Sequence, residues 1–347
     1  MNGYLKFSWW AFLGAVIVGP SQAFAIELQS NNWNLNLFGY VAGRVASPED
    51  RNGEDIALGE TSVFVFGRLS DRVSVLTEVT VLPKKYRQDT VKVERLRLRF
   101  DFSEKHWLSL GKMHTPVNYW NDSYHHGRYF FPTIERPQVF KQFVPIHDIG
   151  LRFSGSRLGK YGFFYDIVLG SGQSAGNKAF ANGLQSMTVA VGVRPIKNLE
   201  IRTSYYKDTI INHWSSPDHA GLQPRENSDL DYALWSGSIH YENNRFKALG
   251  EFSGSRTVST KKNWASYLYL GWKWRPRVVP YYFFDYLNVD PEEQHYSVGI
   301  QRRYGVGLEY LISERLNLKV ELTHNDSTKD GTAQSDADIR FQLSVSI

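Results

Sequence analysis

The 347-residue sequence contains no cysteine. Without thiol groups the chain cannot form zinc–thiolate sites, iron–sulfur clusters, cysteine nucleophiles or disulfide bonds, and it cannot carry the cysteine-linked anchor of a lipoprotein. It also lacks any apolar run of the roughly 18 residues that a membrane-spanning helix needs. A large excess of one charge is missing too, because the formal net charge is only +5 and does not predict nucleic acid as a partner.

Aromatic residues, in contrast, are abundant in a sequence that is polar on average. There are 20 Tyr, 21 Phe and 10 Trp, although the mean hydropathy is −0.39. A soluble domain would hide so many rings in a core rich in aliphatic residues. A transmembrane β-barrel combines both properties, because its rings face lipid while its interior is wet.

Residues 1–25 are predicted to be a secretory signal peptide that is not part of the fold. Lys6 precedes a short apolar run, and Ala23 and Ala25 form a small-x-small cleavage site. A membrane anchor is the alternative, but the apolar run is shorter than a spanning helix requires. The mature chain would begin at residue 26 and would be exported through the inner membrane.

Most of the remaining sequence alternates between apolar and polar residues. From 96 to 102, for example, Leu or Phe flanks each of Arg97, Arg99 and Asp101, and 316–322 shows the same alternation. A helix would spread these charges around its circumference, whereas a strand places all of them on one face. The period of two therefore predicts strands.

Sixteen segments of this kind are predicted, joined by connections that alternate between short and long. The predicted strands are 34–45, 62–70, 72–82, 90–102, 106–114, 148–156, 160–170, 185–195, 198–208, 231–242, 245–254, 263–274, 277–287, 296–311, 315–325 and 337–347. Short turns on one rim and long loops on the other are typical of outer-membrane barrels. We therefore predict that residues 26–347 form an all-β fold, a transmembrane antiparallel up-and-down β-barrel of about 16 strands. A soluble β-sandwich or β-helix is the alternative.

The two ends of the chain fit a closed barrel. An even number of strands places both termini on the periplasmic short-turn side, and the alternation of the last segment continues to Ile347. The final strand of a barrel must pair with the first, because otherwise an unpaired edge would face lipid.

The predicted inner face is rich in charge. Its basic residues are Arg44, Arg95, Arg97, Arg99, Arg152, Arg194, Arg202, Lys247, Lys273, Arg303, Lys319 and Arg340, and its acidic residues are Glu78, Asp101, Asp166, Glu200, Glu251, Glu309 and Glu321. Charges at this density predict a water-filled lumen. Arg95, Arg97 and Arg99 form a ladder that either passing anions or acids of an inward-folded loop must compensate. The alternative is a girdle of charge that only holds such a loop.

The third long connection, residues 115–147, is the candidate constriction of the lumen. A connection of this length is uncommon unless it has a function. Its many aromatic and proline residues favour a rigid body packed inside the barrel mouth. The side chains that would line the constriction are His125, His126, Arg128, Arg136 and Lys141.

Two short segments resemble the general porins of Gram-negative bacteria, and more loosely the phosphate-selective porins. Residues 110–116, Leu-Gly-Lys-Met-His-Thr-Pro, resemble the Gly-basic-x-x-Thr-Pro element that leads into the constriction loop, and 37–40, Leu-Phe-Gly-Tyr, resemble the first strand. The resemblance implies a homotrimeric, water-filled channel in which the loop faces a basic wall. The matching wall positions, here called the basic wall, are Arg95, Arg97, Arg99 and Arg152. The terminal Ile347 and the lack of an acidic loop-tip motif depart from the family pattern.

The predicted function is therefore that of an outer-membrane porin without enzymatic activity or cofactors. Small hydrophilic or anionic solutes would diffuse through it with a modest anion preference. Expected partners are outer-membrane lipid, these solutes, further copies in a homotrimer, and the barrel-assembly machinery during biogenesis. The predicted pore-lining residues are Arg95, Arg97, Arg99, Arg152, Arg44, Arg303, Glu78, Asp101, His125, His126, Arg128, Arg136 and Lys141.

The sequence leaves three other interpretations. His324, Asp326 and Ser327 lie together in sequence and suggest a hydrolase at the extracellular rim, although a triad depends on geometry. A closed barrel that acts as a structural protein or surface receptor would conduct no ions. A metal site around His125 and His126 is disfavoured, because adjacent residues rarely bind one zinc ion together.

Overall fold

The structure, a computed structural model, describes most of the chain. The described residues are 33–46, 55–81, 91–124, 128–175, 183–211, 229–257, 262–290, 293, 295–296, 298–329 and 332–347. The predicted signal peptide, residues 1–25, lies outside these ranges. So do His125 and His126, two of the predicted pore-lining residues.

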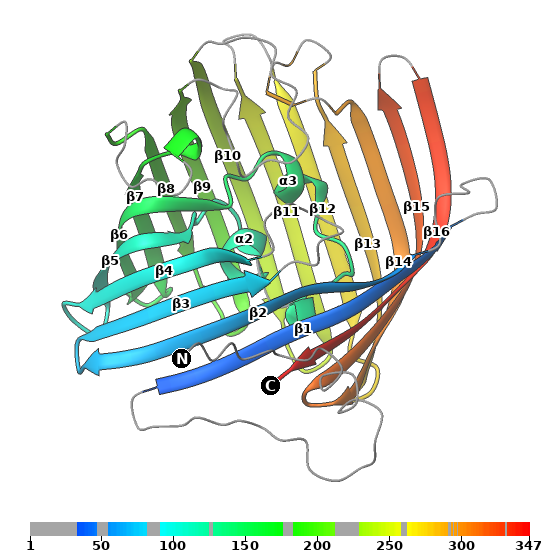
Figure 1. Ribbon diagram of the computed structural model, residues 1–347, viewed down its shortest axis with the longest axis horizontal. Helices are drawn as coiled ribbons and strands as arrows, with labels where there is room; N and C mark the ends of the chain where they lie inside the picture. The colour runs from blue at the N-terminus through cyan, green and yellow to red at the C-terminus, as the bar shows by residue number, and fades with distance from the viewer. Residues whose placement is uncertain are drawn as a thin grey trace, which may run out of the picture.

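Sixteen strands form one closed antiparallel barrel, in which β1 pairs with β16 (Figure 1). The strands are β1 (Trp33–Ala46), β2 (Asp55–Ser70), β3 (Val73–Val81), β4 (Val91–Asp101), β5 (His106–His114), β6 (His147–Leu158), β7 (Phe163–Gly170), β8 (Ser186–Val193), β9 (Leu199–Ile210), β10 (Leu230–Glu242), β11 (Phe246–Arg256), β12 (Asn263–Trp272), β13 (Val278–Asn288), β14 (Ile300–Ser313), β15 (Leu316–Lys329) and β16 (Thr332–Ser346). The predicted up-and-down barrel is confirmed. No helix in the described ranges is long and apolar enough to cross a membrane.

Two predicted loops turn out to be partly strand. β2 begins at Asp55, before the expected start, because its pairing with β1 continues past a bulge between Gly39 and Val41. A bulge interrupts the period of two on which strand prediction depends. The β15–β16 hairpin stays paired up to Lys329 and Thr332, where a loop was expected. Both of its faces are largely polar there, so no alternation marks the strands.

The two faces of the barrel wall differ strongly in chemistry. On β15, Leu322 points outward and is 55% exposed, whereas its neighbours Glu321 and Thr323 are buried inside. Outward rings form a row toward the rim that carries the long connections. In this row the ring centroids of Trp264 and Tyr286 lie 4.6 Å apart and those of Phe252 and Trp264 5.9 Å apart. An outward apolar band edged by aromatic rings is typical of a barrel surrounded by lipid.

The connection 115–147, from here on the inner loop, lies inside the barrel (Figure 1). It contains the helices α2 (Tyr119–Tyr124), η1 (Arg128–Phe130) and α3 (Gln138–Gln142). α2 contacts β10, α3 contacts β12 and β13, and η1 reaches β1 and β16. The inner loop therefore crosses the lumen from one wall to the other.

Candidate functional site

The base of the inner loop is built by the segment that resembles the porin element. Gly111 adopts a φ of +117°, and a Cβ atom there would lie 2.1 Å from the carbonyl oxygen of Leu96, so only glycine fits without displacement. The amide of Thr115 donates to the carbonyl of Ile146 at 3.1 Å. Asn121 Nδ2 donates to the carbonyl of Thr115 at 2.8 Å. These bonds hold the two ends of the loop together at the barrel wall.

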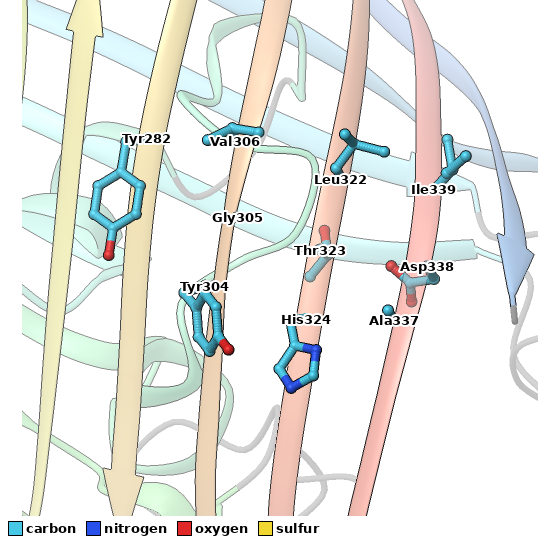
Figure 2. A pocket seen from close by; sticks show the side chains of 10 residues that line it. All are labelled: Tyr282, Tyr304, Gly305, Val306, Leu322, Thr323, His324, Ala337, Asp338 and Ile339. Atoms are coloured by element: carbon cyan, nitrogen blue, oxygen red, sulfur yellow. The ribbon is translucent and has the colours of Figure 1, made fainter.

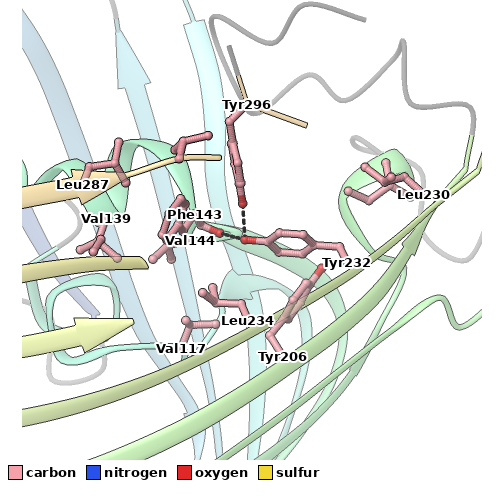
Figure 3. Packing of buried hydrophobic residues seen from close by; sticks show 13 residues of the cluster. Val117, Val139, Phe143, Val144, Tyr206, Leu230, Tyr232, Leu234, Leu287 and Tyr296 are labelled. Carbon is pink, nitrogen blue, oxygen red and sulfur yellow. Dashed lines mark hydrogen bonds between the residues drawn. The ribbon is translucent and has the colours of Figure 1, made fainter. Parts of the chain in front are cut away.

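One side of the inner loop is packed into a hydrophobic core against β9, β10, β12 and β13 (Figure 3). Phe143 at the end of α3 lies against Tyr296, with ring centroids 5.0 Å apart. Tyr232 of β10 donates its hydroxyl proton to the carbonyl of Phe143 and accepts one from Tyr296. Rings and hydrogen bonds together exclude water from this part of the lumen.

A second aromatic cluster holds α2 in place. The fully buried Trp120 lies with its ring centroid 5.4 Å from each of Tyr124, Phe131 and Tyr267, in edge-to-face arrangements. Such pairs add to the free energy gained by burying the rings. Tyr267 comes from β12, so this cluster joins the inner loop to the same side of the barrel as the first one.

Buried carboxylates of the wall fix the path of the loop backbone. Glu251 accepts a hydrogen bond from the amide of Trp120 at 3.0 Å, and Glu321 accepts one from the amide of Ile134 at 2.7 Å. A third acid, Asp285, accepts from the amide of Gln138 at 2.9 Å. Sequence reasoning missed Asp285, together with the inward-facing Asp148, Asp208 and Asp338. The alternation of faces along each predicted strand would have placed all four on the inward side.

The structure brings the basic wall together and gives most of it carboxylate partners. Arg95 pairs with Glu78, and Arg99 Nη2 lies 2.6 Å from Asp101. Arg152 Nε lies 2.9 Å from Asp166. Acids of the wall itself therefore compensate much of the ladder, in addition to the loop acids that the sequence suggested.

Arg97 is the exception in the basic wall. Its Nε is buried without a hydrogen-bond partner, and within the described part of the chain no carboxylate pairs with its guanidinium group. The residue opposite it on β5 is Gly111, which places no side chain next to it. Arg97 thus contributes an uncompensated positive charge to the lumen.

Asp122 of α2 links the inner loop to the basic wall. Its carboxylate lies 3.2 Å from Arg152 Nη2 and 2.8 Å from Arg202 Nη1. Burial of this carboxylate favours its neutral form, but the two guanidinium groups outweigh burial and hold the pKa of Asp122 well below its usual range. Arg202 was predicted to face inward, but neither it nor Asp122 was among the predicted pore-lining residues. Their contact could not be predicted because it joins segments far apart in sequence.

The other predicted pore-lining residues are distributed around the inner loop. Arg303 is buried on β14, where it binds Asp285 and the carbonyl of Arg136, and so holds the loop away from the basic wall. Arg136 itself reaches Glu60 at 3.0 Å. Lys141 pairs with Glu135 at 2.7 Å within the loop.

For two further positions only the backbone is described. Arg44 lies on β1, where its backbone pairs with that of Arg340 of β16. Arg128 begins η1, the part of the inner loop that contacts β1 and β16.

A polar cluster on the outside of the barrel corresponds to the hydrolase hypothesis. His324 Nε2 lies 3.0 Å from Asp326 Oδ1 and 3.1 Å from Ser335 Oγ, while Ser335 donates to Asp326 at 2.8 Å. The serine is therefore Ser335 of β16, whereas Ser327 was expected from sequence proximity. An apolar groove crosses β13 to β16 at this level, and its lining includes both Tyr304 and His324 (Figure 2).

Two other histidines, His114 and His147, lie together near the base of the inner loop. The ring centroids of His114 and His147 are 5.1 Å apart, and His147 Nε2 lies 3.5 Å from Glu94 Oε2. Among the described residues, no group of three or more His, Cys, Asp or Glu has the geometry to hold a metal ion.

Solved structures share this barrel, although no family model and no curated protein sequence matches the chain. An anion-selective porin from Comamonas acidovorans matches with a TM-score of 0.63 at 9% identity, over 91% of this chain and 100% of that one. OprB of Pseudomonas putida matches with 0.63 at 11% identity, over 91% and 94%. The chain has the fold of the outer-membrane porins. The predicted resemblance is thereby confirmed at the level of fold, which is what a match at this identity shows.

The same comparison corrects one expectation. OmpT of Vibrio cholerae, in a trimer form, matches with a TM-score of 0.60 at 12% identity, over 91% of this chain and 100% of that one. OmpT thus shares the barrel with the porins, and a fold does not by itself assign or exclude a chemistry. The inference from a porin-like barrel to a protein without enzymatic activity is therefore wrong.

Proposed function

We propose that the protein is a porin, a passive channel for small hydrophilic solutes with a modest preference for anions. The supporting observation is the unequal filling of the lumen. The inner loop packs tightly against β9 to β13, whereas Arg97 and Arg99 of the basic wall are only partly buried and border a cavity. Solutes would pass between the inner loop and this wall.

The anion preference rests on Arg97. The other three arginines of the basic wall have carboxylate partners, and Arg97 has none in the described ranges, so its charge attracts mobile anions. A single charge about 8 Å from an ion in water contributes about 0.5 kcal/mol, which favours an anion over a cation only modestly.

Conductance of the purified protein in a planar bilayer tests this proposal. In a potassium chloride gradient the reversal potential should have the sign of an anion-preferring channel. Arg97→Gln should lower the chloride-to-potassium permeability ratio by about twofold or more. Arg194→Gln is the matched control, because Arg194 also lies in the lumen but is paired with Glu200 at 2.7 Å. A barrel that does not conduct would contradict the channel, and a cation preference would contradict the role of Arg97.

The setting of this channel is part of the proposal. Residues 1–25 would be cleaved on export, and the barrel would insert into the outer membrane of a Gram-negative bacterium with the help of the barrel-assembly machinery. Its copies would form a homotrimer, as the trimer form of Vibrio cholerae OmpT suggests. N-terminal sequencing of the mature protein should begin at Ile26, and native mass spectrometry should give the mass of three chains.

The second candidate function is a hydrolase at the rim, favoured by the contacts among His324, Asp326 and Ser335. Both oxygens approach the same ring nitrogen, whereas a triad needs the carboxylate and the hydroxyl on different nitrogens. The imidazole would have to turn over before Ser335 could be activated. A fluorophosphonate probe should then label the protein and fail to label Ser335→Ala. Absence of labelling in the wild type would dismiss this candidate.

A further inference from the structure

A cavity of about 240 Å³ lies at the foot of the basic wall, beside the turn that joins β2 to β3. We call it the foot pocket. The residues of its lining that the argument uses are Phe66, Arg68, Asp71, Arg97, Arg99 and Asp101. All of them belong to β2, β4 or the turn after β2, so one rigid part of the barrel wall forms the pocket. The described residues of the inner loop contribute nothing to its lining.

The charge of the foot pocket suits a monovalent anion. Three guanidinium groups face two carboxylates, which leaves one positive charge in excess. Arg99 is held by Asp101, with its Nε donating to Oδ1 at 2.7 Å, while Arg97 has no carboxylate in the described residues. A dianion such as hydrogen phosphate would bring a second negative charge next to Asp71 and Asp101, which repel it.

The shape of the foot pocket suits a single planar ring. Its volume lies below the roughly 300–1,000 Å³ of pockets for drug-sized ligands. Phe66 shares the inward face of β2 with Phe64, over whose ring the Arg95 guanidinium lies at 5.3 Å. An inward phenyl ring next to arginines can stack on an aromatic solute while a guanidinium binds its carboxylate through two hydrogen bonds.

Arg97 would receive the carboxylate, and its neighbour Arg99 is held in a fixed position. The guanidinium of Arg99 lies 4.1 Å from the centre of the Trp107 ring and is bound to Asp101, so its position is set from two sides. Stacking and pairing of this kind limit the rotamers that a long side chain can adopt. Arg97, next to it on the same face, remains available to the solute.

We infer that the foot pocket binds single-ring aromatic monocarboxylates, of which benzoate is the simplest, as they pass through the lumen. This inference rests on the proposed channel, because the pocket is reached from the lumen. Arg97 binds the carboxylate, Phe66 stacks on the ring, and the inner loop keeps solutes on this side of the barrel. Aliphatic carboxylates, inorganic phosphate and neutral aromatic amides each lack one of the features that the pocket recognises.

The test measures how solutes reduce the chloride current through single channels, because a bound solute obstructs the passage. Benzoate should halve the current at a concentration at least about tenfold lower than acetate, phosphate or benzamide, since each of these loses a ring contact or a charged hydrogen bond. Equal reduction by acetate or phosphate would overturn the inference.

Two variants and one control identify the binding groups. Arg97→Gln should raise the half-blocking concentration of benzoate about tenfold. Phe66→Leu should bring benzoate close to acetate without changing the effect of acetate, because only the ring contact is lost. Arg194→Gln removes the same charge elsewhere in the lumen and should leave the benzoate effect unchanged. A wild-type response in Arg97→Gln would overturn the assignment.

Calorimetric titration of the detergent-solubilised barrel with benzoate separates the two proposals. If the wild-type protein binds benzoate but does not conduct, and Arg97→Gln abolishes the binding, the channel is refuted and the ligand site is retained. Conductance without heat of binding or benzoate block would retain the channel and refute the ligand.

Discussion

Alternating strands place side chains in the lumen on both of its sides, but the result differs. One side is a packed aromatic core and the other is a charged, partly exposed wall. On β12 and β13, inward rings such as Tyr267 and Tyr269 are at most 2% exposed, because the inner loop covers them. On β4, Arg95 and Arg99 keep 19% and 31% of their side-chain surface exposed, and the foot pocket lies beside them. One barrel therefore contains a packed core and a charged wall that face each other across the inner loop.

The difference between these sides follows from what their side chains can pair with. Tyrosine and phenylalanine rings gain free energy when they exclude water. The hydroxyl groups of Tyr232 and Tyr281 also find acceptors, a loop carbonyl and a wall carboxylate respectively. Guanidinium groups at close spacing repel one another, so the loop cannot press against them without supplying acids. Asp122 is one such acid, and it binds the edge of the basic wall at Arg152.

The largest expected difference between the two sides is in the free energy of unfolding lost when a ring is removed from each. Trp120→Ala should lower the free energy of unfolding by about 3–5 kcal/mol, because it leaves a cavity in a fully packed cluster. Trp107→Ala on the wall side should cost about 1 kcal/mol, since this ring is only half-buried and water can fill the space. Thermal unfolding followed by the shift between folded and unfolded bands on a gel measures both. Equal losses would mean that the two sides are packed alike.

Removing a carboxylate from each side is expected to give the next largest effect. Asp285→Asn leaves Arg303, which is 3% exposed, without its counter-charge, and breaking a buried pair should cost about 3 kcal/mol. Asp101→Asn changes a half-exposed pair on the wall and should cost less than about 1 kcal/mol. The wall variant should instead raise the anion preference, measured as the reversal potential. A stable Asp285→Asn barrel would contradict the anchoring of the loop.

Mild acid should have the smallest effect on stability. It acts on Asp122, which links the inner loop to the basic wall and whose carboxyl has a lowered pKa. A carboxyl whose pKa is lowered in the folded state contributes stability above its unfolded pKa of about 3.9 and loses that contribution as the pH falls through the folded pKa. The contact should therefore persist between pH 7 and pH 4. Asp122→Asn should cost about 2 kcal/mol across this window. A difference between wild type and variant that shrinks between pH 7 and pH 5 would contradict the lowered pKa.

The barrel and the orientation of its charges could be predicted from the sequence. Alternation with a period of two fixed the strands, and because side chains of a strand point to opposite faces, it also placed Arg95, Arg97 and Arg99 in the lumen. It failed where the pattern itself is interrupted, at the bulge near Gly39 and in the polar hairpin after His324. Elsewhere, strand formation and side-chain orientation are local properties, and local sequence is sufficient to predict them.

Which of these charges are compensated depends on contacts between segments that are far apart in the sequence. Asp122 meets Arg202 across 80 positions of sequence, and Gln138 meets Asp285 across 147, so neither contact has a local signal. The path of the inner loop is the sum of such contacts with both walls of the barrel. That path leaves Arg97 without a carboxylate in the described structure while Arg303 is buried with one, although both were equally inward-facing basic residues in the sequence.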